Sequence, residues 1–183
     1  MKKYILSSAL ISIALLFYIQ INAPVSGKTL SNPVPAPTFT HPDKEEWLNS
    51  PPLSWNDLHG KVVLIDFWAF ECWNCYRSFP WLTAMEARLP KEHFQIIGVH
   101  SPEFDREKIK ANVIKKAAEF NLHHPIMIDN DFSYWKALNN RYWPAYYIVD
   151  KENNIRAVFY GETHEGNKQA KAIERIIKEL IAE

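Results

Sequence analysis

Two cysteines, Cys72 and Cys75, are the only cysteines in the 183 residues, and two residues separate them. Side chains three positions apart lie on the same face of a helical turn, close enough for two sulfur atoms to bond. A pair of this kind can form a structural disulfide, supply half of a metal site or act as a redox dithiol. The residues around the pair decide between these three possibilities.

The redox interpretation is the one that the surroundings favour. A structural disulfide that closes so short a loop restricts the unfolded chain very little. A zinc site needs four ligands, and the seven histidines include no pair at the usual ligand spacing, so we expect no bound metal. A CxxC pair between a core strand and an amphipathic helix is typical of redox sites. The structural disulfide and the metal carrier stay open as alternatives.

The elements that position the cysteines follow from the hydrophobic pattern. Residues 61–70, KVVLIDFWAF, form a nearly continuous apolar run that is typical of a strand buried on both faces. The segment after Cys75 has apolar residues at helical spacing, and Pro80 within it should bend that helix rather than end it. Cys72 should therefore lie at a helix N-terminus, where free N–H groups and the helix dipole stabilise a thiolate.

The rest of the chain alternates between strand and helix patterns. Strands are predicted at residues 94–100, 124–129, 145–150 and 155–160, and helices at 106–120, 132–138 and 167–183. This order predicts an α/β fold with a mixed sheet. Its first strands should be parallel and joined by helical crossovers, its last two should form an antiparallel hairpin, and helices should flank both faces.

The N-terminal residues have the layout of an export signal. Lys2 and Lys3 precede a predominantly apolar run without charges, from residue 5 to residue 21. This pattern indicates that residues 1–27 are a signal peptide or an N-terminal membrane anchor. We therefore expect the rest of the chain to be exported to the periplasm or another extracytoplasmic compartment, either free or anchored to the inner membrane.

The segment that follows is rich in proline. Residues 28–46 include Pro33, Pro35, Pro37 and Pro42, a spacing that favours an extended, semi-rigid linker. Residues 47–183 are then left as one domain of ordinary size. The chain has 21 basic and 21 acidic residues and no charge blocks, so it lacks the electrostatic footprint of a nucleic-acid-binding protein.

Residues 63–80, VLIDFWAFECWNCYRSFP, resemble the active-site motif of the thioredoxin superfamily. Asp66 begins the D-F-W-A sequence of that motif, the two cysteines occupy its CxxC, and Pro80 stands at its helix-kinking proline. The stretch YWPAYYIVDKENNIRAVFYGE resembles the cis-proline strand and final hairpin of the superfamily. The resemblance covers residues 54–183 and implies a thioredoxin-like sheet flanked by helices on both faces.

Two further stretches resemble one branch of the superfamily. HPIMIDNDFSYWKAL, residues 124–138, is an additional strand and helix before the cis-proline strand, which makes the chain similar to exported TlpA/ResA-type proteins. GVHSPEF, residues 98–104, is similar to the thioredoxin-like C-terminal domains of DipZ-type proteins.

The resemblance implies a role for each site residue. Cys72 would be the attacking thiol, and Cys75 would resolve the mixed disulfide formed with the substrate. Asp66 would be the buried carboxylate that accepts the proton of Cys75, and burial should raise its pKa into a range useful for a base. Pro144 would be cis and lie against Cys72, which leaves the backbone of Trp143 open to pair with an extended substrate.

Four positions near the motif affect substrate binding or the thiol. We assign Trp73 and Asn74, between the cysteines, to substrate binding, although this dipeptide is neither the Gly-Pro of thioredoxin nor the Pro-His of strong oxidants. Glu71 stands where an aromatic is usual, and it would raise the pKa of the Cys72 thiol unless it is a solvated surface carboxylate. Trp143 replaces the usual Thr, Val or Ile, and either narrows the substrate groove or belongs to the core.

Together these features predict an exported thiol–disulfide oxidoreductase that acts on protein thiols and disulfides. It would need no cofactor beyond its own disulfide and would exchange electrons with a membrane-bound or exported donor. No Lys, Arg or His lies between or directly before the cysteines, and Asp66 and Glu71 flank them, so we expect a weakly stabilised thiolate and a reducing direction.

Two other classes of function stay open. One is a thiol peroxidase of the same fold, which would normally need an Arg, Thr or Gln near the attacking cysteine; the nearest such residue is Arg77. The other is a non-catalytic binding or metal-carrying module.

Overall fold

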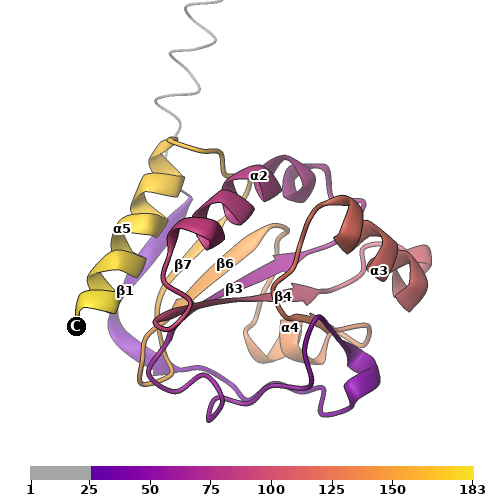
Figure 1. Cartoon of the computed structure of the whole chain (residues 1–183), viewed down its shortest axis with the longest axis horizontal. Coiled ribbons are helices and arrows are strands. Elements are labelled where there is room, and N and C mark those ends of the chain that lie inside the picture. The colour runs from indigo at the N-terminus through magenta and orange to yellow at the C-terminus, as the bar shows by residue number, and fades with distance from the viewer. Residues whose placement is uncertain (1–25) are drawn as a thin grey trace, which may run out of the picture.

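A seven-stranded mixed sheet is the centre of the protein, seen in a computed structural model that describes residues 26–183 (Figure 1). Its strand order is β1-β7-β6-β3-β4-β5-β2. The strands are β1 (Gly27–Pro35), β2 (Trp47–Leu48), β3 (Val62–Trp68), β4 (Phe94–His100), β5 (Ile126–Ile128), β6 (Ala145–Val149) and β7 (Asn154–Tyr160). The helices are α2 (Trp73–Arg88), α3 (Lys110–Glu119), α4 (Ser133–Ala137) and α5 (Lys168–Ala182), with short 3-10 turns η1 (Lys44–Glu46) and η2 (Asp105–Lys108).

The pairing of the strands confirms the predicted topology. β3 is parallel to β4 and β4 is parallel to β5, whereas β6 is antiparallel to both β3 and β7. The predicted inserted strand and helix are β5 and α4, and β6 and β7 form the predicted hairpin. Helix α2 continues through Pro80, as expected.

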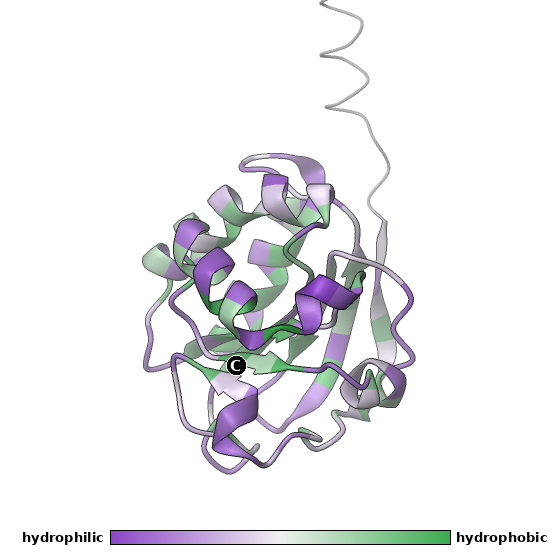
Figure 2. Ribbon diagram, turned by 90° about the vertical axis from the view of Figure 1, so that its right-hand side faces the viewer, coloured by the Kyte–Doolittle hydropathy of each residue, from purple (hydrophilic) through white to green (hydrophobic). Residues whose placement is uncertain are grey.

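Two hydrophobic layers hold the sheet between its helices. Helices α2, α3 and α5 cover one face, and α4 with the chain between β1 and β3 covers the other (Figure 1). All seven residues of β3 are buried, because this central strand has apolar neighbours on both sides. Apolar residues are accordingly concentrated on the strands (Figure 2). Each large side chain buried in this way contributes about 1.5–3 kcal/mol to folding.

The stretch predicted as a linker contributes a strand to the sheet. β1 pairs antiparallel with β7 and has no partner on its other side. Proline lacks an N–H donor, and edge strands tolerate it because one side needs no partner. The proline spacing that suggested a linker is therefore equally compatible with an edge strand. The sheet therefore already includes residues that precede position 47, the predicted start of the domain.

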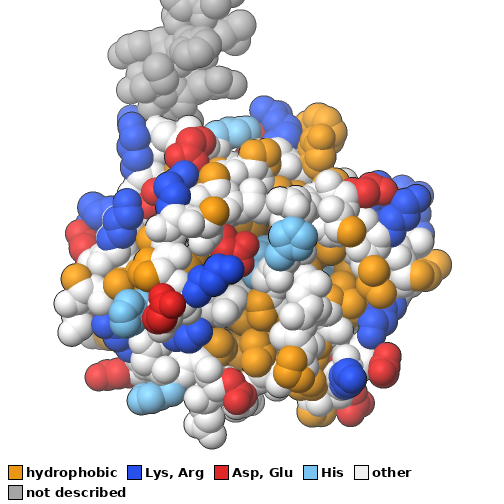
Figure 3. All heavy atoms as spheres, viewed as in Figure 1, with side chains coloured by type: hydrophobic (Ala, Val, Ile, Leu, Met, Phe, Trp, Pro, Cys, Tyr) orange, Lys and Arg blue, Asp and Glu red, His pale blue; other side chains and the backbone are white. Residues whose placement is uncertain are grey.

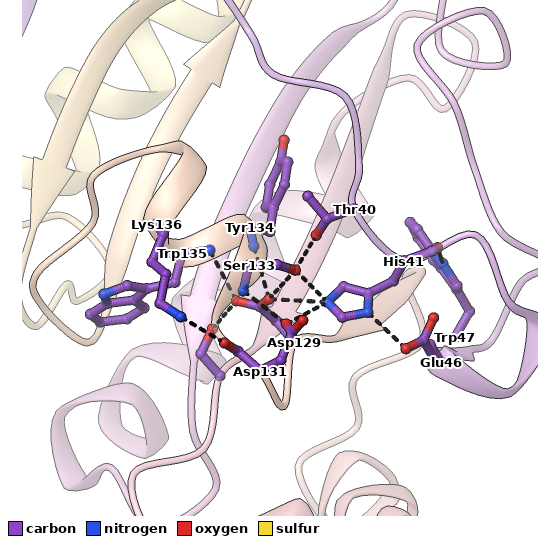
Figure 4. A network of polar contacts seen from close by, with 11 residues as sticks. Thr40, His41, Glu46, Trp47, Asp129, Asp131, Ser133, Tyr134, Trp135 and Lys136 are labelled. Carbon is purple, nitrogen blue, oxygen red and sulfur yellow. Dashed lines mark hydrogen bonds and ion pairs between the residues drawn. The ribbon is translucent and has the colours of Figure 1, made fainter.

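His41 fastens the chain after β1 to the connection between β5 and α4. Its Nδ1 lies 2.9 Å from Glu46 Oε1, and its Nε2 lies 3.1 Å from Oδ1 of the buried Asp129 (Figure 4). The hydrogen bond to Asp129 outweighs the effect of burial and, together with Glu46, raises the pKa of His41 to about 9. An imidazolium can donate to both carboxylates at once, so this tether is held by charge-assisted hydrogen bonds.

The surface mixes charges of both signs. On the face drawn in Figure 3, acidic and basic side chains are interspersed, in keeping with the zero formal net charge. Within residues 26–183, no helix combines the length and the apolar character needed to span a bilayer. The predicted signal peptide or anchor lies outside the described residues, except for its last two positions.

Candidate active site

The two cysteines form a disulfide at the point where β3 leads into α2. Cys72 is the N-cap of α2, and its Cα lies 5.3 Å from that of Cys75. The backbone N–H of Cys75 donates to the Cys72 sulfur, with an N–S distance of 3.2 Å. The same N–H would stabilise a Cys72 thiolate after reduction, together with the helix dipole. The predicted position of Cys72 at a helix N-terminus is confirmed.

The two sulfur-bearing residues differ in their access to solvent. Cys72 is 8% exposed, whereas Cys75 is 0% exposed. Of the two, only Cys72 lines a surface pocket of about 280 Å³. We call this the Cys72 pocket; its other lining residues are Glu71, Trp73, Asn74, Glu103, Phe104 and Trp143. An incoming sulfur can therefore approach Cys72 from the pocket and cannot reach Cys75 directly.

Asp66 is a buried acid on the sheet face that carries α2. It is 2% exposed and alternates along β3 with residues of the opposite face, so its side chain points to the same layer as Leu64 and Trp68. Burial raises the pKa of Asp66 to about 8. This pKa is close to the usual pKa of a thiol, about 8.5. That Asp66 exchanges a proton with Cys75 stays a prediction.

The peptide bond between Trp143 and Pro144 is cis, as predicted. The indole of Trp143 is fixed on one side, because its Nε1 donates to the carbonyl oxygen of Ser101 at 3.0 Å and its ring packs on Trp135 with centroids 4.2 Å apart. The same side chain also lines the Cys72 pocket. Trp143 thus belongs partly to the core and narrows the groove as well.

The residues between the cysteines face the pocket. Trp73 is 65% exposed and stacks on Tyr76 with ring centroids 5.3 Å apart. Asn74 also lines the Cys72 pocket, and its backbone carbonyl oxygen accepts a hydrogen bond from the hydroxyl of Ser78. Both residues line the Cys72 pocket, and their role in substrate binding stays a prediction.

The electrostatic surroundings of Cys72 differ from those assumed from the sequence. Glu71 forms an ion pair with Arg106, a residue that the sequence analysis did not assign to the site. The hydrogen bond from Arg106 lowers the pKa of Glu71 and compensates its charge. Because Asp66 is largely protonated at pH 7, neither carboxylate places an isolated negative charge beside the sulfur.

A buried carboxylate, Glu107, holds the walls of the Cys72 pocket together. It is 0% exposed, and its Oε1 accepts from the backbone N–H of Glu71 at 2.9 Å. Its Oε2 accepts from the N–H groups of Glu103 and Phe104 at 2.6 and 2.8 Å. The sequence predicts a helix from residue 106, whereas Glu107 lies in the 3-10 turn η2 and α3 begins at Lys110. Nothing in the local pattern distinguishes Glu107 from its charged neighbours.

Removing this anchor should destabilise the protein. The Glu107→Ala variant would leave three N–H groups without their charged acceptor, and we expect a loss of about 2–3 kcal/mol in the free energy of unfolding. Urea unfolding of the oxidised protein measures this loss. Glu92→Ala, at an exposed position ahead of β4, is the control and should stay close to the wild type. Equal stability of the two variants would contradict the anchoring role.

Comparison with known proteins places this chain in a family. Residues 34–158 match the model of the AhpC/TSA family. The chain is 42% identical over 119 residues to the protein DipZ of Mycobacterium bovis, a match that covers 63% of this chain and 17% of DipZ. It is 26% identical over 149 residues to the thiol-disulfide oxidoreductase YkuV of Bacillus subtilis, covering 81% of this chain and 95% of YkuV.

A solved structure has the same architecture. The solution structure of a thioredoxin-like protein in its oxidised form superimposes with a TM-score of 0.69 and 25% sequence identity, covering 84% of this chain and 98% of that one. The resemblance to DipZ-type domains predicted from GVHSPEF agrees with the match to DipZ. This chain belongs to the AhpC/TSA family and has a thioredoxin-like fold with a Cys72–Cys75 disulfide.

Proposed function

We propose that the protein is an exported thiol–disulfide oxidoreductase that exchanges disulfides with protein substrates through Cys72 and Cys75. The observation that carries this proposal is the asymmetry of the pair: Cys72 caps α2 and lines a surface pocket, and Cys75 is fully buried behind it. The substrate thiol or disulfide would meet Cys72, and Cys75 would release it. The similarity to the thiol-disulfide oxidoreductase YkuV supports the same chemistry.

The chemical steps follow from the order in which the sulfurs can be reached. In the reduced protein, the Cys72 thiolate attacks a substrate disulfide, and one substrate sulfur leaves as a thiolate that takes up a proton. Cys75 then gives its proton to the ionised form of Asp66 and attacks the Cys72 sulfur. This attack re-forms the Cys72–Cys75 bond and releases the second substrate sulfur as a thiolate, which takes up a proton. Two electrons pass from the protein dithiol to the substrate in one cycle.

We propose the reducing direction because the described lining of the Cys72 pocket adds no cation to the stabilisation that the N-terminus of α2 gives the thiolate. Among the described residues, no Lys, Arg or His lines the Cys72 pocket. His100, at the end of β4, is kept neutral because burial lowers its pKa to about 3. A less stabilised thiolate favours the disulfide form of the pair, so the dithiol gives up its electrons readily.

The equilibrium reduction potential of the Cys72–Cys75 pair tests this direction. Measured against a glutathione redox buffer, it should lie near that of thioredoxin, about −270 mV. A value near those of the strongest oxidants, about −120 mV, would show that the pair oxidises its substrates instead. Tryptophan fluorescence is a suitable signal, since Trp73 and Trp143 line the pocket beside the disulfide.

Export and the electron donor belong to this proposal as well. The pattern of residues 1–27 supports translocation across the inner membrane, with the domain free or anchored on the far side. The donor that re-reduces the disulfide would then be a membrane-bound or exported protein. Separating periplasmic from membrane fractions of cells that produce the full chain would show which form is present.

A thiol peroxidase is the second candidate, and the arginines near the pair do not favour it. Arg77 is paired with Glu162 at 2.9 Å, and Arg106 is paired with Glu71. Each guanidinium is thus already held by a carboxylate, and neither arginine lines the Cys72 pocket. A single-turnover reaction of the reduced protein with hydrogen peroxide would distinguish the two, because a peroxidase should react far faster than an ordinary dithiol.

A further inference from the structure

The Cys72 pocket has an unusual composition for a site next to a reactive cysteine. Three of its lining residues are aromatic, namely Trp73, Phe104 and Trp143, and two are acidic, namely Glu71 and Glu103. Trp73 is 65% exposed and Phe104 is 49% exposed, although large apolar side chains are usually covered. Aromatic side chains beside carboxylates form surroundings that attract an organic cation.

The charge of the pocket is negative. The carboxylate of Glu71 is already compensated by Arg106, which lies outside the lining of the pocket. Glu103 is exposed and, within residues 26–183, its carboxylate forms no ion pair. One uncompensated carboxylate therefore stands at the rim, and in the described part of the chain no lining residue is basic. A cation entering from solvent would meet an opposite charge and no like charge within the pocket.

The guanidinium of Arg106 is already held by an aromatic ring and a carboxylate of this pocket. The Cζ atom of Arg106 lies 5.4 Å from the centroid of the Phe104 ring, while its nitrogen atoms pair with Glu71. An aromatic face and a carboxylate thus already bind one cation next to the pocket. Glu103, Trp73 and Trp143 line the pocket beside Cys72 and offer the same combination of groups.

The wall that carries Glu103 and Phe104 is fixed in advance. Glu107 accepts hydrogen bonds from both of their backbone N–H groups and from that of Glu71. The loop therefore does not need to be ordered when a ligand binds, which removes part of the entropic cost of binding. The exposed side chains of a rigid loop are well placed to distinguish one substrate from another.

We propose that the Cys72 pocket is a subsite for a lysine or arginine side chain that neighbours the reactive cysteine of the substrate protein. Glu103 would pair with the cation, and the rings of Trp73 and Trp143 would cover its alkyl stem. This inference rests on the proposed function and specifies the substrates on which it acts. The volume of the Cys72 pocket, about 280 Å³, is large enough for one lysine or arginine side chain.

Matched peptides test the subsite. Three disulfide-linked peptides would differ only at the residue next to the reactive cysteine, which is Lys, Ala or Glu. For the wild-type protein at low salt, we expect the Lys peptide to be reduced about five- to tenfold faster than the Ala peptide, and the Glu peptide to be slowest. In the Glu103→Gln variant, the ratio of the Lys rate to the Glu rate should fall to about twofold or less.

Salt and a control variant distinguish a local subsite from the charge of the whole protein. Raising the sodium chloride concentration to about 0.5 M should reduce the wild-type ratio, because it screens an exposed ion pair. Glu92→Gln removes another exposed carboxylate, which precedes β4 and therefore lies at the end of this strand opposite the Cys72 pocket. This variant should keep the wild-type ratio. A similar fall in both variants would overturn the assignment to Glu103.

A small neutral disulfide, 2-hydroxyethyl disulfide, separates this inference from the proposed function. If the wild-type protein reduces this compound and all three peptides at equal rates, the subsite is wrong and the proposed function stands. If the protein reduces neither the compound nor any peptide, the oxidoreductase function fails and the subsite fails with it. A Lys preference that depends on Glu103 supports both.

Discussion

The Cys75→Ser variant is expected to accumulate a covalent complex with its substrate through Cys72. The reduced variant keeps the sulfur that lines the pocket and loses the buried one that would release the substrate. Intramolecular attack by a well-placed group exceeds attack by an external thiol by many orders of magnitude, so release should slow by roughly a thousandfold or more. Non-reducing electrophoresis of the reduced variant with insulin or another disulfide-bonded protein measures the adduct.

The matched variant is Cys72→Ser, which keeps only the buried sulfur. We expect it to form no adduct, since Cys75 is 0% exposed and a substrate disulfide cannot approach it. Peptide mapping of the Cys75→Ser adduct should place the mixed disulfide at Cys72. Adducts of comparable yield in both variants would contradict the assigned order of attack and release, whatever the overall activity of the protein.

Much of the fold could be predicted because its elements have strong local patterns. The run at 61–70 indicated β3, since a central parallel strand is apolar on both faces. The inserted strand and helix at 124–138 and the final hairpin also appear as predicted. β1 was missed because pairing with β7 is a property of the folded sheet, and the prolines of an edge strand look the same as those of a linker.

The site could be predicted only as far as its residues are close in sequence. Cys72, Cys75 and Asp66 lie within ten residues, and the resemblance to the thioredoxin superfamily supplied Pro144. The second wall of the Cys72 pocket comes from the loop after β4, more than thirty residues away. Arg106 and Glu107 were predicted as the start of a helix and lie in the turn η2 instead. Only the folded chain shows that one compensates Glu71 and the other is buried.

This second wall also changes the electrostatic argument. From the sequence, Glu71 and Asp66 seemed to place two negative charges beside the dithiol. In the structure, Arg106 compensates the first and burial keeps the second protonated at neutral pH. The proposed reducing direction therefore rests on the absence of cations in the described lining of the pocket rather than on repulsion by these two carboxylates.

The Asp66→Asn variant is expected to change how the stability of the oxidised protein depends on pH. The pKa of Asp66 rises from an ordinary value of 3.8 to about 8 on folding because the carboxyl is buried. An acid whose pKa is raised by folding does not lower the free energy of unfolding at a pH below its unfolded pKa. Between the unfolded and the folded pKa, the free energy of unfolding falls as the pH rises. At about 1.4 kcal/mol for each pKa unit, the wild type should lose up to roughly 5 kcal/mol between pH 4 and pH 8.

The asparagine cannot ionise, so the variant should lack this loss and be the more stable protein at pH 8, with little difference near pH 4. Urea unfolding at both pH values measures the effect, and Asp43→Asn, at an exposed site whose side chain makes no capping hydrogen bond, should retain the wild-type dependence. Parallel curves for the wild type and Asp66→Asn would show that Asp66 ionises normally.

The Asp66→Asn variant should also resolve mixed disulfides about a hundredfold more slowly at pH 7, because it has lost the base for Cys75. A stability gain at high pH that comes with slower release would identify Asp66 as a group retained for proton transfer at the expense of stability.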